Sequence, residues 1–146
     1  MKALVEKITG TNAGFDTLAI RLAAGVIFMA HGAQKLFGWF GGYGLEGTGG
    51  WMESIGLAPG VLMAALAGGA EFFGGLMLII GLLVRPAALM LGITMVVAIV
   101  TVHLENGLFM SNNGYEFGLV LLALSITLFI RGAGSLSADS LLGQKF

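Results

Sequence analysis

Glu71 has the clearest chemical potential in this chain because it lies inside an apolar run. Residues 61–83 read VLMAALAGGAEFFGGLMLIIGLL and carry no other charge. A carboxylate at the centre of a membrane helix costs roughly 3 kcal/mol unless it is paired or protonated. We therefore expect Glu71 to have a partner and to mark a functional site.

The preceding apolar segment supplies basic side chains that could pair with Glu71. Arg21, Phe28, His31 and Lys35 follow helical spacing, which places them within roughly 80° on one helix face. The start of the first segment and the end of the second are expected on the same side of the membrane. Measured from that side, Arg21 lies roughly 8 Å deep and Glu71 roughly 15 Å deep. We therefore predict that Arg21 is the counter-ion of Glu71. The pair is either purely structural or also positions a ligand or carries a proton.

The opposite ends of the apolar segments collect further polar side chains. His31 and Lys35 lie in the outer third of the first segment, His103 ends the third, and Glu116 begins the fourth. We expect them to converge on one cavity, where His31 hydrogen-bonds a carbonyl-bearing ligand, relays protons or binds a metal. Simpler interpretations remain open, since Glu116 suits a helix dipole and His103 suits a membrane border.

Several chemistries can be weighed against these residues. A haem between His31 and His103 is one alternative, because both lie in the outer half. No metal site is predicted, because no HxxE, ExxH or HxxxH pair occurs, and no GxSxG motif supports a serine nucleophile. The pattern favours a bilayer-accessible pocket for a quinone-like or small polar molecule. These residues do not by themselves assign a catalytic role.

The composition is that of an integral membrane protein with one domain, residues 1–146. Mean hydropathy is +0.94. Charged residues make up 10% of the chain, against about 25% in soluble domains. No basic run indicates nucleic-acid binding. The chain has no cysteine, so electrons in any redox reaction must reside on a bound cofactor or substrate.

Four apolar segments approach the roughly 20 residues needed to span a bilayer. They are residues 17–37, 61–83, 87–103 and 115–130. Because backbone groups in lipid must be satisfied within the segment, these predict an all-α, four-helix transmembrane bundle. Small residues along the first two segments favour close helix packing. The first 16 residues are expected to form a short amphipathic surface helix.

The basic residues predict the orientation of the bundle. Those outside the helix cores all fall on one side, which is cytoplasmic by the positive-inside rule. They are Lys2, Lys7, Arg85, Arg131 and Lys145. Both termini are therefore expected in the cytoplasm, and residues 38–60 and 104–114 form the two external loops. The first loop, rich in glycine and aromatic residues, is either an interfacial anchor or a cap over a cavity.

Two stretches resemble the DoxX family of small bacterial membrane proteins. In LAIRLAAGVIFMAHGAQKLFGWFGG, the matching positions are Arg21, Gly25, His31, Gly32, Lys35, Leu36 and Phe37. In LAGGAEFFGGLMLIIGLLVRPAALML, they are Glu71, Gly74, Gly75, Gly81 and Arg85. A weaker match, EFGLVLLAL, begins at Glu116. The resemblance implies a multi-pass protein of the cytoplasmic (inner) membrane, in a family that includes the membrane subunit of a thiosulfate:quinone oxidoreductase.

The resulting hypothesis is a redox-associated subunit that binds a quinone or similar amphiphile. It has no intrinsic cofactor, so a partner redox protein would deliver electrons. Its expected ligand-binding residues are Arg21, His31, Lys35, Glu71, His103 and Glu116. One alternative is a small proton-coupled transporter that uses Glu71. Another is a non-catalytic membrane scaffold for partner redox proteins. Glycine-rich faces also permit a homo-oligomer.

Overall fold

A computed structural model of the chain describes residues 1–11 and 13–143, and over these residues it is helical with no strand. Lys145, which entered the charge count, lies outside the described residues. The helices are α1 (Lys2–Thr9), α2 (Asp16–Phe37), α3 (Gly44–Ser54), α4 (Gly60–Ile80), α5 (Val84–Ala98), α6 (Glu116–Arg131) and α7 (Ala138–Gly143). Short elements η1 (Trp39–Gly41), η2 (Ile99–His103), η3 (Leu104–Asn106) and η4 (Met110–Asn112) join them.

Three helices are long and apolar enough to cross a membrane. They are α2, α4 and the continuous run Val84–Asn106, in which η2 and η3 extend α5. The fourth expected segment corresponds to α6, which has 16 residues. The predicted segment 61–83 is too long by three residues, because Gly81 ends α4 in the left-handed conformation at φ 73°. Such a glycine is a common helix stop.

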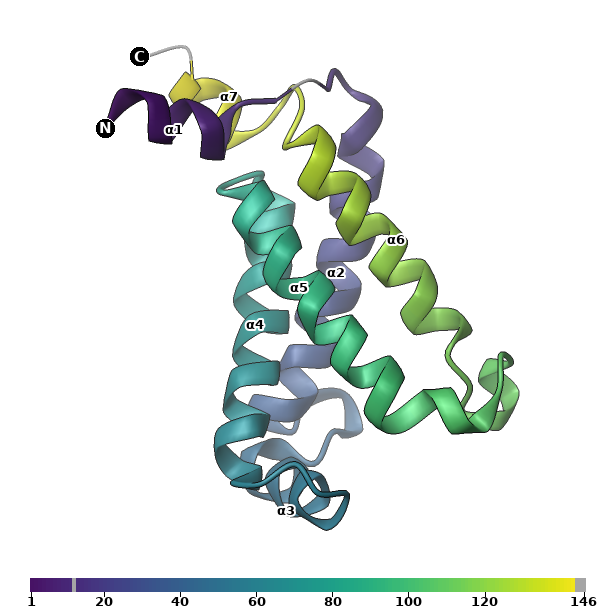
Figure 1. The fold of residues 1–146 in the computed structure, drawn as a ribbon. Coiled ribbons are helices and arrows are strands. Elements are labelled where there is room, and N and C mark those ends of the chain that lie inside the picture. The colour runs from purple at the N-terminus through teal and green to yellow at the C-terminus, as the bar shows by residue number, and fades with distance from the viewer. Residues whose placement is uncertain (12, 144–146) are drawn as a thin grey trace.

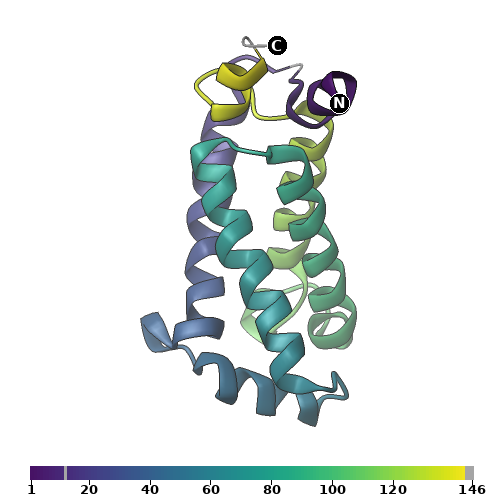
Figure 2. The ribbon, with the colours of Figure 1, turned by 90° about the vertical axis from the view of Figure 1, so that its left-hand side faces the viewer.

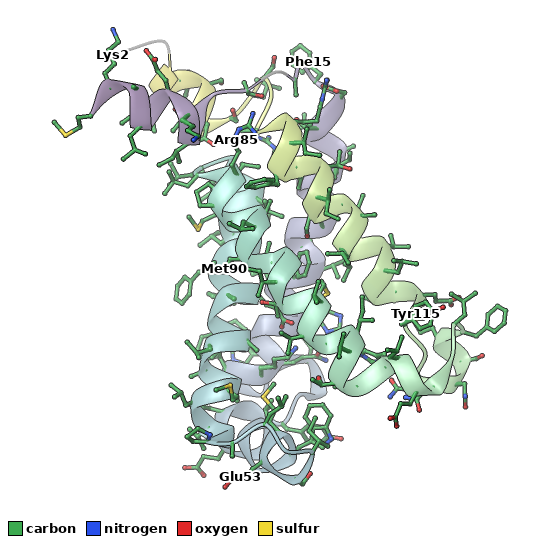
Figure 3. All side chains as sticks on the ribbon, in the orientation of Figure 1. Lys2, Phe15, Glu53, Arg85, Met90 and Tyr115 are labelled. Carbon is green, nitrogen blue, oxygen red and sulfur yellow. The ribbon has the colours of Figure 1, made fainter. Side chains whose placement is uncertain are left out.

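The long helices pack as two pairs. α2 lies along α4, α5 lies along α6, and further contacts join α4 to α5 and α2 to α6. Figures 1 and 2 place α1, α7 and the α4–α5 turn at one end of the molecule and α3 at the other. Figure 3 shows Lys2 and Arg85 at the first end, with Glu53 at the second. The segments expected on the same side of the membrane therefore lie together.

Glycines bring α2 and α4 into backbone contact, as the sequence predicted. A Cβ on Gly25 would lie 2.8 Å from the carbonyl oxygen of Gly75, and one on Gly32 would lie 2.7 Å from that of Gly68. A side chain at either position of α2 would therefore clash with α4. This close approach fixes the level at which the polar side chains of α2 meet α4.

The region 38–60, expected as a loop, contains a helix. α3 covers Gly44–Ser54 and packs against α4. Thr48, Gly49 and Met52 are its buried residues, and a Cβ on Gly49 would lie 2.8 Å from the backbone of Val61. The sequence analysis did not predict this helix, because four of its eleven residues are glycine and glycine is a poor helix former. The expected N-terminal helix is present as α1.

The C-terminal segment, which the sequence analysis left unassigned, closes the α1 end of the molecule. Asp139 on α7 is buried, and its carboxylate accepts the backbone N–H groups of Leu83 and Val84 at 2.8 and 3.0 Å. It thereby caps the start of α5 from a distant part of the chain. Burial raises the pKa of Asp139 despite these two hydrogen bonds and the nearby charge of Arg21.

Candidate functional site

The partner of Glu71 is Lys35, not Arg21. Lys35 Nζ donates to Glu71 Oε2 at 2.6 Å, joining α2 to α4. The Glu71 side chain is 4% exposed and that of Lys35 is 24% exposed. The prediction that Glu71 has a basic partner is confirmed, and the choice of Arg21 is wrong.

The direction in which side chains lean on a helix explains why Glu71 pairs with Lys35 and not with Arg21. Side chains lean toward the N-terminus of their own helix. α2 and α4 are antiparallel, with Gly32 opposite Gly68. Lys35 therefore leans toward the level of Glu71, and Glu71 leans toward Lys35. Arg21, about 21 Å from Lys35 along α2 at 1.5 Å per residue, leans the other way.

Arg21 belongs to the C-terminal closure of the molecule. It is fully buried, and its Nη2 donates to the carbonyl oxygen of Leu136 at 2.9 Å. Its Nε and Nη1 have no hydrogen-bond partner among the described residues. Asp139 is the acidic group that acts on it electrostatically. The structure thus separates Arg21 from the other expected site residues.

A cavity of about 250 Å³ lies where the two helix pairs meet. Its polar lining comes from His31, Lys35, Glu71, His103 and Asn113, and its apolar lining includes Phe28, Met95, Phe117 and Leu121. Four of the six sequence-predicted residues therefore share one cavity. The volume is slightly below the roughly 300–1,000 Å³ of common small-molecule pockets. The space suits a compact ring with a few polar substituents.

The ion pair leaves hydrogen-bonding capacity for a ligand. An ammonium group has three donor hydrogens, and an ionised carboxylate accepts at two oxygens. Only the bond between Lys35 Nζ and Glu71 Oε2 uses them among the described residues. His31 lies near, with its ring 6.1 Å from that of Phe117 and tilted by 47°. Donors, acceptors and an aromatic wall therefore meet at one place.

His103 reaches the cavity from the end of the extended α5. It closes η2, a π-helical turn of five residues, and its Nδ1 lies 2.9 Å from the carbonyl oxygen of Asn113. π-turns occur frequently at functional sites. Asn113 takes the left-handed conformation at φ 57°, which asparagine tolerates better than most residues.

Glu116 does not line this cavity, although its neighbours Phe117 and Gly118 do. Its backbone N–H donates to the carbonyl oxygen of Leu108 at 2.9 Å, and it begins α6. The helix-dipole interpretation accounts for that position. Sequence reasoning missed Asn113 and Phe117. The Asn-Asn-Gly run before α6 is a turn signal that could have drawn attention to Asn113.

Comparison with known proteins agrees with the resemblance seen in the sequence. The DoxX family matches residues 17–104. The chain is 36% identical over 123 residues to a Bacillus subtilis (strain 168) protein named "Putative oxidoreductase CatD", covering 84% of each chain. It is 30% identical over 142 residues to an uncharacterized Haemophilus influenzae protein, covering 96% of this chain and 91% of the relative. No solved structure matches it significantly. With its motifs, its helices and these relatives in agreement, the chain belongs to the DoxX family.

Proposed function

We propose that the chain is a multi-pass bacterial inner-membrane protein that binds a quinone or similar amphiphile in the cavity between its helix pairs. The observation that carries this proposal is the ion pair between Lys35 and the buried Glu71, with a donor and an acceptor available beside apolar and aromatic walls. Quinones have a flat ring with oxygens that accept hydrogen bonds or, once reduced, also donate them. The cavity offers partners for both forms.

In this proposal α2, α4, α5 and α6 all span the membrane, with both termini in the cytoplasm. Lys2 and Lys7 on α1 and Arg85 on α5 lie at the end where α1 and α7 pack (Figure 3). The opposite end carries Glu46 and Glu53 on α3. This asymmetry follows the positive-inside rule. α6 has 16 residues, just below the lower limit of about 17 for a helix that spans a bilayer.

The same proposal makes the chain a redox-associated subunit rather than a self-sufficient oxidoreductase. It has no cysteine, and the described residues contain no cluster of three or more metal-ligating side chains. Electrons would come from a partner redox protein. The name of the Bacillus subtilis relative, a putative oxidoreductase, supports a general association with redox chemistry. Exposed apolar side chains along α4 and α5 are also compatible with a homo-oligomer.

The test is native mass spectrometry of the purified protein with its co-purified lipids. The wild type is expected to carry a quinone. Glu71→Gln and His31→Ala are expected to lose it, because each removes a polar group that lines the cavity. Lys7→Met, an exposed change on α1, is the control and should retain it. A wild type that carries only phospholipid would contradict quinone binding.

Two other functions give different results in companion assays. A proton-coupled transporter that uses Glu71 would show pH-driven uptake of a cation into proteoliposomes. In that case the cation would have to displace Lys35 from the carboxylate of Glu71. A membrane scaffold would tolerate substitutions in the cavity and respond to those in α3 or residues 104–114. The quinone proposal predicts neither uptake nor silent cavity variants.

A further inference from the structure

The segment between α5 and α6 holds His103 in one hydrogen-bonding state. Its Nδ1 lies 2.9 Å from the carbonyl oxygen of Asn113. A carbonyl oxygen only accepts, so Nδ1 must carry the hydrogen. In the neutral ring, Nε2 is then a hydrogen-bond acceptor. The hydrogen bonds among the described residues leave Nε2 free, and His103 lines the cavity.

The carbonyl that orients His103 is itself held in place. Asn106 Nδ2 donates to it at 3.1 Å and also to the carbonyl oxygen of Val102 at 3.0 Å. Asn112 Nδ2 donates in turn to the carbonyl oxygen of Asn106 at 3.0 Å. The side chains of Asn106 and Asn112 and the backbone carbonyl of Asn113 thus form a hydrogen-bonded network beside the imidazole.

The free Nε2 distinguishes a ligand that carries a hydroxyl group from one that carries a carbonyl group. A hydroxyl group can donate to an acceptor, whereas a carbonyl oxygen cannot. A ligand hydroxyl facing His103 donates a hydrogen bond to Nε2. A ligand carbonyl in the same place cannot, because its oxygen and Nε2 are both acceptors. An acceptor placed against another acceptor loses the hydrogen bond that it made with water, which costs free energy. Lys35 offers donors to either form. The remaining acceptor capacity of Glu71 also favours a hydroxyl, and His103 adds a second acceptor that a ligand carbonyl cannot satisfy.

We propose that His103 makes the cavity selective for the reduced, hydroxyl-bearing form of its quinone-like ligand, with Asn106 and the Asn113 carbonyl as positioning groups. This rests on the proposed function and deepens it by naming the form that the site prefers. The step is binding alone, and no electron moves in it. A site of this kind retains the quinol, which the proton-accepting side of His103 stabilises.

The test compares the affinities of the two forms. A short-tailed benzoquinone and its hydroquinone are titrated anaerobically into the detergent-purified full chain by calorimetry. We expect the wild type to bind the hydroquinone about tenfold more tightly, the upper range for one hydrogen bond. In His103→Phe this preference should fall to about twofold or less, while the affinity for the quinone stays within about twofold.

Two further variants separate positioning from folding. Asn106→Leu leaves the imidazole present but less well oriented, so the preference should fall to about threefold. Glu105→Gln changes an exposed neighbour of the network and should keep the full preference. If His103→Phe does not fold, Asn106→Leu carries the test.

Each remaining outcome is decisive. A wild type that binds both forms equally overturns the inference and leaves the proposed function intact. The same holds if His103→Phe or Asn106→Leu keeps the full preference, or if either weakens both forms alike. A wild type that binds neither form overturns the proposed function together with the inference.

Discussion

Removing Lys35 should destabilise the protein more than neutralising Glu71. The Glu71 side chain is 4% exposed and Lys35 is 24% exposed. In Lys35→Met, Glu71 stays buried without a partner, which costs about 3 kcal/mol. In Glu71→Gln, Lys35 can extend into the cavity and the amide can still accept its hydrogen bond, so we expect a loss of about 1 kcal/mol.

The double variant Lys35→Met/Glu71→Gln tests the pairing itself. It contains no buried charge at this place, so its loss should also be about 1 kcal/mol, which gives a coupling of about 3 kcal/mol. The assay is reversible unfolding in bicelles by SDS titration, with Lys7→Met on the exposed face of α1 as the control. Losses that simply add in the double variant would refute the reasoning.

Further predictions concern the glycine contact between α2 and α4, the cap of α5 and the independence of Arg21 from Glu71. Gly75→Ala should cost about 1–3 kcal/mol, because its Cβ would lie 2.6 Å from the carbonyl oxygen of Gly25. Gly69→Ala, with nothing within 4 Å, should instead stabilise slightly in the same unfolding assay. Asp139→Ala should cost about 1–2 kcal/mol through the lost cap of α5. Because burial raises the pKa of Asp139, wild-type stability relative to Asp139→Asn should fall as pH rises above about 4; a difference that grows with pH would contradict this. The effects of Arg21→Met and Glu71→Gln should add within about 0.5 kcal/mol in a double-variant cycle, and a larger coupling would restore Arg21 as a partner.

Apolar length and small-residue spacing were sufficient to predict the long helices. α2, α5 and α6 begin or end within a few residues of the expected segments. The glycines that join α2 and α4 were visible as a helical stripe, because small residues permit close backbone approach. α3 was not predicted. It forms because glycine backbone packs closely against α4 at Gly49, and this tertiary contact overrides poor helix propensity.

The site was only partly readable from the sequence. The need of Glu71 for a partner and the convergence of His31, Lys35 and His103 followed from burial cost and helix ends. The wrong partner followed from counting depth alone. The lean of side chains toward the helix N-terminus was available from the sequence and would have favoured Lys35. The role of Asp139 was not available, because it depends on a contact between residues 55 apart.

Photoaffinity labelling tests the central claim most directly, because it asks where a quinone binds. The protein in liposomes is irradiated with an azido-quinone, and the labelled peptides are mapped by mass spectrometry. The account predicts labels on cavity-lining residues such as Met95 and Phe117, and expects an excess of unmodified quinone to prevent them. Labels that appear only on exposed residues outside the cavity, such as Leu66 or Ile130, with no competition, would contradict it.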